Sequence, residues 1–243
     1  MVRSITVTLF AIAAFLFHGG VASAGESEEF LIAVEDSLAH YREATSYLRT
    51  GNIDLAAIEL ENMADTWRAI RERFGATPPD AFDGNAAYGP TLAETARTVE
   101  AALAAIDADR PEDAATLLRP VAATVSAMRR RSSVYRLGDC ILDAGAAMDA
   151  LFVYKETPPD LADRMLGADV VGKAAVYRAT LKRCAAMAPA AMREEPEFRR
   201  LFDGADTSLQ RIPEAVVNAD SSLLYRLLIE LRSFDRLIYF RYG

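Results

Sequence analysis

The sequence predicts an all-α protein built as tandem up-and-down four-helix bundles, with about eight helices in four hairpins. Apolar residues recur at steps of three and four along nearly every segment after Glu28, as at Leu31, Val34 and Leu38. No segment keeps the alternation of apolar and polar residues that indicates a β-strand. Because 51% of the residues are hydrophobic, the chain can bury a substantial core.

The first bundle is expected in residues 26–131. A Gly-Asn pair at positions 51–52 separates its first two helices, because glycine ends helices and asparagine caps the next one. Prolines and glycines then interrupt the pattern between Gly75 and Pro90, which predicts a loop of about 16 residues. The third helix is expected from Thr91 to Asp107, and the fourth opens with Pro111, whose missing N–H costs nothing in a first turn.

The second bundle is expected in residues 132–243. Its first helix ends at the Thr-Pro-Pro-Asp sequence of residues 157–160, and its second stops before Pro189. A third helix covers about residues 196–211, with a further proline just beyond it that ends or kinks the helix. The last helix, from Ser221, is the most apolar of all, so we expect it to be central or to pack against a second copy or a partner.

A weak internal repeat accompanies this pattern. The hairpin turns recur about every 55 residues, a period compatible with duplicated helical units. Residues 42–75 and 210–243 have equal length and end on Arg-Phe-Gly and Arg-Tyr-Gly, and Leu60 matches Leu228 between them. The repeat favours four helical hairpins.

Residues 1–24 have the composition of a cleaved signal peptide. Arg3 supplies a positive charge, the apolar run Ile5–Phe17 follows, and Ala22-Ser23-Ala24 forms a cleavage site of small residues. An uncleaved membrane anchor is the alternative, but the run is shorter than the roughly 20 residues that cross a bilayer. We therefore expect a periplasmic or secreted protein that begins near Gly25 and has no membrane insertion after cleavage.

The charge of the expected mature chain argues against two classes of partner. Without Arg3 it has 26 basic and 35 acidic residues, a net charge of −9. A strongly negative protein repels nucleic acid and anionic lipid head groups, so no nucleic acid is expected as a partner. A protein partner or self-association remains compatible with this charge.

The leader, the hairpins, the long loop between the second and third helices and a unit of about 105 residues resemble exported four-helix bundles of the cytochrome c-prime and cytochrome b562 kind. Covalent haem requires Cys-x-x-Cys-His. The ends of the fourth and eighth helices, residues 126–135 and 234–242, contain neither cysteine nor histidine. The sequence therefore excludes covalently attached haem, and we expect no cofactor of this kind.

Non-covalent haem could use one histidine and one methionine. After removal of the leader the chain keeps a single histidine, His40, and Met63 on the second helix is at a compatible height in an antiparallel hairpin. The alternative is that His40 is a partly exposed residue on the flank of its helix. Di-iron sites in bundles use Glu-x-x-His, which does not occur in this sequence.

Cys140 and Cys184 are expected to form a disulfide. They lie near opposite ends of successive antiparallel helices, and an exported chain meets an oxidising environment. A bridge closing a loop of about 45 residues would stabilise the fold by about 3–4 kcal/mol. The alternative is two separate buried thiols.

A soft metal such as Cu(I) is the sharpest ligand hypothesis. Cys140, Met148, Cys184 and Met187 would supply two thiolates and two thioethers near one another if the two helices pair. Against this, methionine at core spacing usually fills gaps, and a disulfide would consume both thiolates.

Arg129, Arg130 and Arg131 are a candidate surface for an anion or an acidic protein partner. The alternative is that these cations complement the dipole at the end of their helix. No nucleophile elbow, P-loop or dinucleotide motif occurs in the sequence. We therefore expect a non-enzymatic protein for partner binding or scaffolding, with a metal or haem carrier as the alternative.

Overall fold

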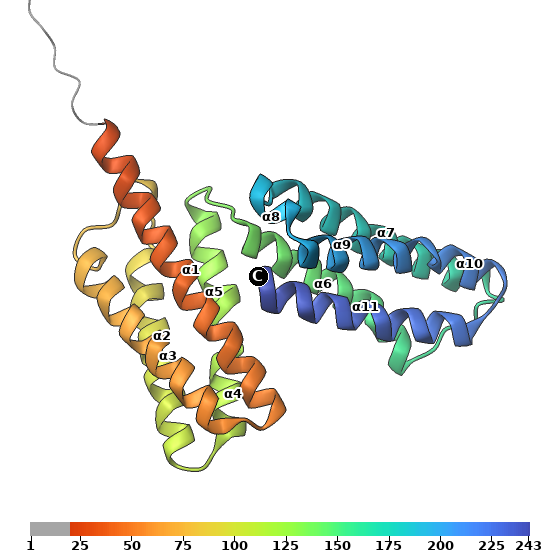
Figure 1. The fold of residues 1–243 in the computed structure, drawn as a ribbon, viewed down its shortest axis with the longest axis horizontal. Helices are drawn as coiled ribbons and strands as arrows, with labels where there is room; N and C mark the ends of the chain where they lie inside the picture. The colour runs from red at the N-terminus through yellow and green to blue at the C-terminus, as the bar shows by residue number, and fades with distance from the viewer. Residues whose placement is uncertain (1–19) are drawn as a thin grey trace, which may run out of the picture.

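The structure is a computed structural model that describes residues 20–243 (Figure 1). These residues are all-helical, and no β-strand occurs among them. The expected signal peptide, residues 1–24, lies outside the described residues up to position 19, and its expected cleavage site falls near the start of α1 (Gly20–Thr50). No described helix has the length and the apolar content needed to cross a membrane.

The N-terminal helices follow the predicted pattern with three differences. Their bounds are α1 (Gly20–Thr50), α2 (Ile53–Phe74), η1 (Asp80–Phe82), α3 (Tyr88–Asp107), α4 (Pro111–Leu118) and α5 (Val121–Arg131). The expected long loop contains the short helix η1, and α3 begins before Pro90, which a first turn tolerates. The expected fourth helix is divided into α4 and α5 at Pro120, because proline cannot donate the hydrogen bond that would continue α4.

The C-terminal helices have bounds α6 (Leu137–Glu156), α7 (Arg164–Met187), α8 (Ala190–Glu194), α9 (Pro196–Gln210), α10 (Ile212–Val217) and α11 (Ser221–Tyr242). The short helix α8 was not expected from the sequence. The expected third helix of this part of the chain, about residues 196–211, corresponds to α9, and Pro213 stands just beyond it in the first turn of α10, a further short helix that was not expected.

Four turns share one backbone geometry, in which a residue one or two positions after the helix adopts a positive φ. These residues are Gly51 (φ 78°), Asp109 (φ 58°), Ser133 (φ 56°) and Ala219 (φ 50°). In each turn this residue donates its N–H to the carbonyl three positions back, and the next residue donates to the carbonyl five positions before it. This is the Schellman arrangement, which satisfies two carbonyls at the end of the helix and reverses the chain.

The buried apolar side chains form two clusters, which we call the N-terminal core (residues 30–128) and the C-terminal core (residues 140–238). In the first, α2 packs against α1 and α3, and α4 packs against α3 and α1. In the second, α6 packs against α7 and α11, and α9 packs against α11 and α7. The predicted apolar spacing of three and four residues is confirmed on α2, where the residues with this spacing, Leu60, Met63, Trp67, Ile70 and Phe74, are all buried.

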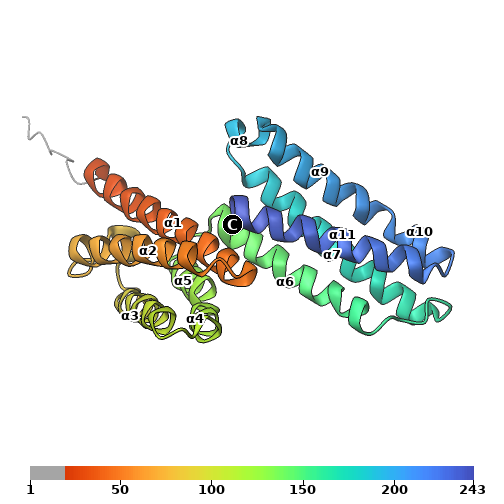
Figure 2. The same cartoon turned by 60° about the horizontal axis from the view of Figure 1, so that its bottom comes forward.

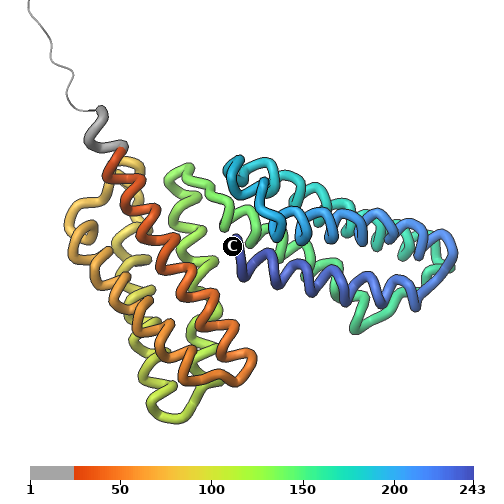
Figure 3. The backbone as a smooth tube through the Cα atoms, viewed as in Figure 1, coloured from red at the N-terminus to blue at the C-terminus, as the bar shows by residue number. Residues whose placement is uncertain are grey.

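The two groups of helices meet near the α5–α6 linker and the end of α11, and their long axes diverge from there (Figures 1 and 2). The chain passes through all the N-terminal helices before it enters the C-terminal ones (Figure 3). Where they meet, the side chain of Tyr239 packs against both cores. The backbone of Gly138 lies against that of Gly243, where a Cβ atom would come within 3.0 Å of the Gly243 carbonyl carbon.

Candidate functional site

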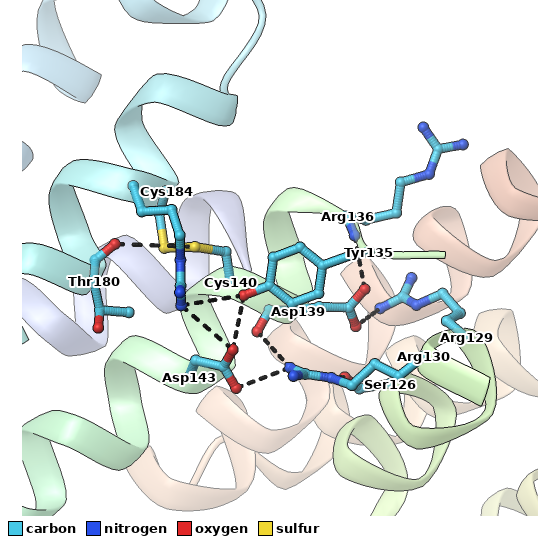
Figure 4. A network of polar contacts seen from close by, with 11 residues as sticks. Ser126, Arg129, Arg130, Tyr135, Arg136, Asp139, Cys140, Asp143, Thr180 and Cys184 are labelled. Carbon is cyan, nitrogen blue, oxygen red and sulfur yellow. Dashed lines mark hydrogen bonds and ion pairs between the residues drawn. A yellow bond between two sulfur atoms is a disulfide. The ribbon is translucent and has the colours of Figure 1, made fainter. Parts of the chain in front are cut away.

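A buried ion pair lies where the two groups of helices meet. Arg129, at the end of α5, donates from Nη2 to Oδ1 of Asp139 on α6 at 2.7 Å, and both residues have no exposed surface (Figure 4). The Nη1 atom of Arg129 also donates to Glu35 of α1. One guanidinium therefore holds three helices together, two from the N-terminal group and one from the C-terminal group.

The second carboxylate oxygen of Asp139 caps the N-terminus of helix α6. It accepts the backbone N–H of Arg136 at 2.8 Å, so Asp139 occupies the third position of a capping box. A carboxylate at this end of a helix also interacts favourably with the helix dipole. Asp139 thus both starts α6 and neutralises Arg129.

A second layer of polar contacts surrounds this pair toward solvent. Arg130 donates to the Asp139 carbonyl at 3.1 Å and to Asp143 Oδ1 at 2.8 Å, while the Tyr135 hydroxyl donates to Asp143 Oδ2 at 2.7 Å (Figure 4). Burial alone would raise the pKa of Asp143, but the hydrogen bonds from Arg130 and Tyr135 outweigh it and lower the pKa below its ordinary value. Asp143 therefore remains an anion, and its hydrogen bonds connect α6 to Arg130 at the end of α5 and to Tyr135 of the linker.

Arg42 and Tyr239 belong to a second contact between the two groups of helices, between α1 and the end of α11. Arg42 of α1 donates from Nε to the carbonyl of Phe240 in α11 at 3.3 Å. Burial raises the pKa of the Tyr239 hydroxyl, so this side chain stays neutral between the two cores. The end of α11 is therefore attached to α1 by a charged donor, Arg42, and by the partly buried aromatic ring of Tyr239.

A cleft of about 610 Å³ opens beside these contacts, between α1 on one side and the linker, α8 and the ends of α7 and α11 on the other. Apolar side chains line much of it, among them Ile32, which is 60% exposed, Met187, which is 36% exposed, and Met192. Charged residues of both signs also line the cleft. Of these, Asp36 and Arg241 form no ion pair with any described residue.

The structure separates the three predicted arginines. Arg129 is buried and paired inside the molecule, so it is not part of a surface for a partner, contrary to the expectation. Arg130 is 40% exposed in its side chain but is engaged with Asp143. Arg131 is exposed at the end of α5, where a cation complements the helix dipole.

The predicted haem ligands do not frame a haem site. His40 is hydrogen-bonded through Nδ1 to Oε2 of Glu59 at 2.7 Å, on the flank of the α1–α2 pair. Met63 is fully buried among the apolar side chains of the N-terminal core. A haem between His40 and Met63 would have to displace packed core residues, so these two residues do not fit the group.

Cys140 and Cys184 form the predicted disulfide between α6 and α7, with Cα atoms 5.5 Å apart. In this state neither sulfur is a thiolate, so the two cysteines cannot serve as soft-metal ligands. Met148 is fully buried in the C-terminal core, whereas Met187 lines the cleft. Within the described part of the chain, no group of three or more His, Cys, Asp or Glu residues is placed to hold a metal ion.

The pairing of Arg129 with Asp139 and Glu35 was not predicted from the sequence. The sequence contains a signal for the role of Asp139, because an acidic residue three positions after the start of a helix is typical of a capping box. Glu35 offered none, since it lies among several acidic residues of α1 and only the packing of the helices brings it to Arg129.

These features describe an all-helical protein in which two apolar cores meet at a polar contact. An open cleft lies beside this contact. Comparison of the chain with protein-family models, with curated proteins and with solved structures finds no match.

Proposed function

We propose that this chain is an exported, non-enzymatic helical protein that binds a segment of a protein partner in the cleft between α1 and the end of α11. The observation that carries the proposal is the cleft itself, about 610 Å³ in volume with exposed apolar side chains and charges of both signs along its walls. Pockets of about 300–1,000 Å³ with apolar walls and a few polar groups are typical of binding sites. Export rests on the leader composition of residues 1–24.

We further propose that the chain consists of two tandem up-and-down four-helix bundles, residues 26–131 and 132–243. Two separate cores support this division, as does the polar linker between α5 and α6. In this arrangement the contact around Arg129 orients one bundle against the other, and the cleft exists only because both bundles contribute a wall. The partner would therefore recognise the pair of bundles.

The side chains that line the cleft indicate the composition of the partner segment. Ile32, Met187 and Met192 offer apolar area to an apolar side chain, and methionine adapts to different shapes. Asp36 and Arg241 offer charges of opposite sign without an internal partner. A short peptide segment with an apolar residue between a basic and an acidic one fits these walls.

Site-specific photo-cross-linking tests the proposal. A photoreactive amino acid at Ile32 should give a discrete adduct in an extract of the compartment where the protein resides, and Met187→Glu should abolish it. Val176 is a matched control, because it is 59% exposed on α7 and lies outside the cleft lining. Equal adducts from both positions, or none from Ile32, would contradict cleft binding.

The same preparation tests the alternative of a metal or haem carrier. A visible spectrum with a haem band that His40→Ala removes, or stoichiometric copper lost in Cys140→Ala, would favour the carrier. An adduct at Ile32 from protein that lacks both would favour partner binding.

A further inference from the structure

Arg42 of α1 is a sheltered cation without a counterion. It is half-buried, and no carboxylate of the described chain lies within 4.0 Å of its guanidinium nitrogens. Every other described arginine or lysine either forms an ion pair or is exposed. The neighbouring Arg129, which is more deeply buried, is neutralised by Glu35 and Asp139.

The hydrogen-bonding capacity of Arg42 is also largely unused. Its Nε donates to the carbonyl of Phe240 at 3.3 Å, whereas its Nη1 is buried and has no hydrogen-bond partner among the described residues. Burial lowers the pKa of the Arg42 guanidinium, and attraction to Glu35 and Glu43 offsets that effect only in part. Arg42 therefore keeps a positive charge that the molecule itself does not neutralise.

Arg42 lies at the inner end of the cleft described above. It lines both the cleft and a small cavity of about 10 Å³, and Gly138 and Gly243 are the other two residues that line both. These glycines contribute only backbone, so Arg42 supplies the one side chain among the three. A group that enters the cleft as far as this end therefore meets the side chain of Arg42.

The lining of the cleft favours a carboxylate that is attached to an apolar group. A guanidinium binds a carboxylate through charge-assisted hydrogen bonds. The charges along the walls balance, so a doubly charged phosphate would meet more repulsion than a single carboxylate; these charged residues are Glu28, Glu35, Asp36, Arg42, Arg136 and Arg241. Ile32, Met187 and Met192 offer apolar area in the same cleft.

We propose that Arg42 binds the side-chain carboxylate of an acidic residue in the partner segment, and that it determines the preference of the cleft for that residue. This inference rests on the proposed binding in the cleft and names the group that the partner must present. A charge pair sheltered from water discriminates more strongly than a pair at an exposed rim, where Arg241 lies. The partner segment then places its acidic residue at the inner end and its apolar residue against Ile32 and Met187.

Three synthetic peptides test which group is recognised. Acetyl-Lys-Leu-Glu-amide and acetyl-Lys-Leu-Gln-amide differ by one charge, and the first should bind the full chain at least about tenfold more tightly in an NMR titration. Equal affinity of these two peptides overturns the proposal. Acetyl-Lys-Leu with a free terminal carboxylate tests the source of the charge. If it binds more tightly than the Glu peptide, an acidic side chain is the wrong source.

Variants of the two arginines test which residue binds the carboxylate. Arg42→Gln removes the charge and should abolish the preference for the Glu peptide, whereas Arg42→Lys keeps the charge and should retain part of the preference. Arg241→Gln is the matched control and should leave the preference unchanged, because Arg241 lines the same cleft but is exposed. Circular dichroism and urea titration check that each variant is folded. A preference that survives Arg42→Gln, or that Arg241→Gln alone removes, overturns the proposal.

The photo-cross-link at Ile32 distinguishes failure of this inference from failure of the proposed function. Arg42→Gln should weaken the adduct at Ile32, and Arg241→Gln should not. An adduct that is unchanged in Arg42→Gln supports binding in the cleft but contradicts the role of Arg42. Absence of any adduct contradicts the proposed function, and a peptide preference that depends on Arg42 would then still support a carboxylate site.

Discussion

Arg129 and Asp139 are ten residues apart on either side of the α5–α6 linker, and they meet as an ion pair excluded from solvent, with Nη2 and Oδ1 2.7 Å apart. Charges buried at this depth are costly unless each is neutralised and hydrogen-bonded. Glu35 and the backbone N–H of Arg136 provide the additional partners. The pair therefore determines how the N-terminal helices are joined to α6.

Removing one member of this pair should be strongly destabilising. Arg129→Met leaves the Asp139 carboxylate buried without its cation, and we expect a loss of about 3–5 kcal/mol in the free energy of unfolding. Arg130→Met is the control and should cost about 1 kcal/mol or less, because its ion pair is partly exposed. Urea titration followed by circular dichroism measures both. Equal small losses would show that the buried pair does not hold the helices together.

The disulfide between α6 and α7 should contribute measurably to stability. The loop that it closes spans 44 positions, so in the chain-entropy model its removal costs about 4 kcal/mol. Replacing Cys140 and Cys184 together by Ala should therefore lower the urea midpoint. Thiol titration of the denatured, unreduced wild-type chain should find no free thiol. Two free thiols would contradict the bridge.

Asp235 makes the stability of the C-terminal core depend on pH. Burial raises the pKa of this carboxyl to about 6, against the attraction of Arg232 and the hydrogen bond from Tyr177. Because the folded state then binds the proton more tightly than the unfolded state, this contribution is full below about pH 4 and is lost as pH rises through about 6.

Comparison with Asp235→Asn isolates this effect. The stability of the wild type relative to the variant should fall between about pH 4 and pH 7, by at most about 3 kcal/mol, and level off above that range. Denaturant titrations at several pH values measure the difference. A relative stability that rises over this range would show that the folded-state pKa is lowered instead.

Ala219 holds a backbone conformation that suits glycine. Its φ of 50° lies in the left-handed region, where a Cβ atom is unfavourable, and it ends α10 in the same geometry that Gly51 provides after α1. Ala219→Gly should therefore stabilise the chain by about 1 kcal/mol. Ala215→Gly, within α10, is the opposing control and should destabilise it, because glycine weakens a helix interior. Thermal unfolding of both variants tests the assignment of this turn.

The local elements could be predicted because their signals are local. The apolar series on α2, the break at positions 51–52 and the start of α11 at Ser221 depend on residues within one or two helical turns. The disulfide could also be predicted, since antiparallel pairing of two consecutive helices brings Cys140 to Cys184. Export and the division into two bundles remain predictions.

The sequence by itself determined where the long helices form and which face of each is apolar, since spacing, prolines and glycines act within a single helix, but it did not predict short helices such as η1 and α8. Only the tertiary structure decided which charges are buried. Arg129, Arg130 and Arg131 are chemically identical and adjacent, yet Arg129 alone is enclosed, because Glu35 and Asp139 converge on it from two other helices. Burying a charge depends on partners brought from distant positions, and no local pattern contains that information.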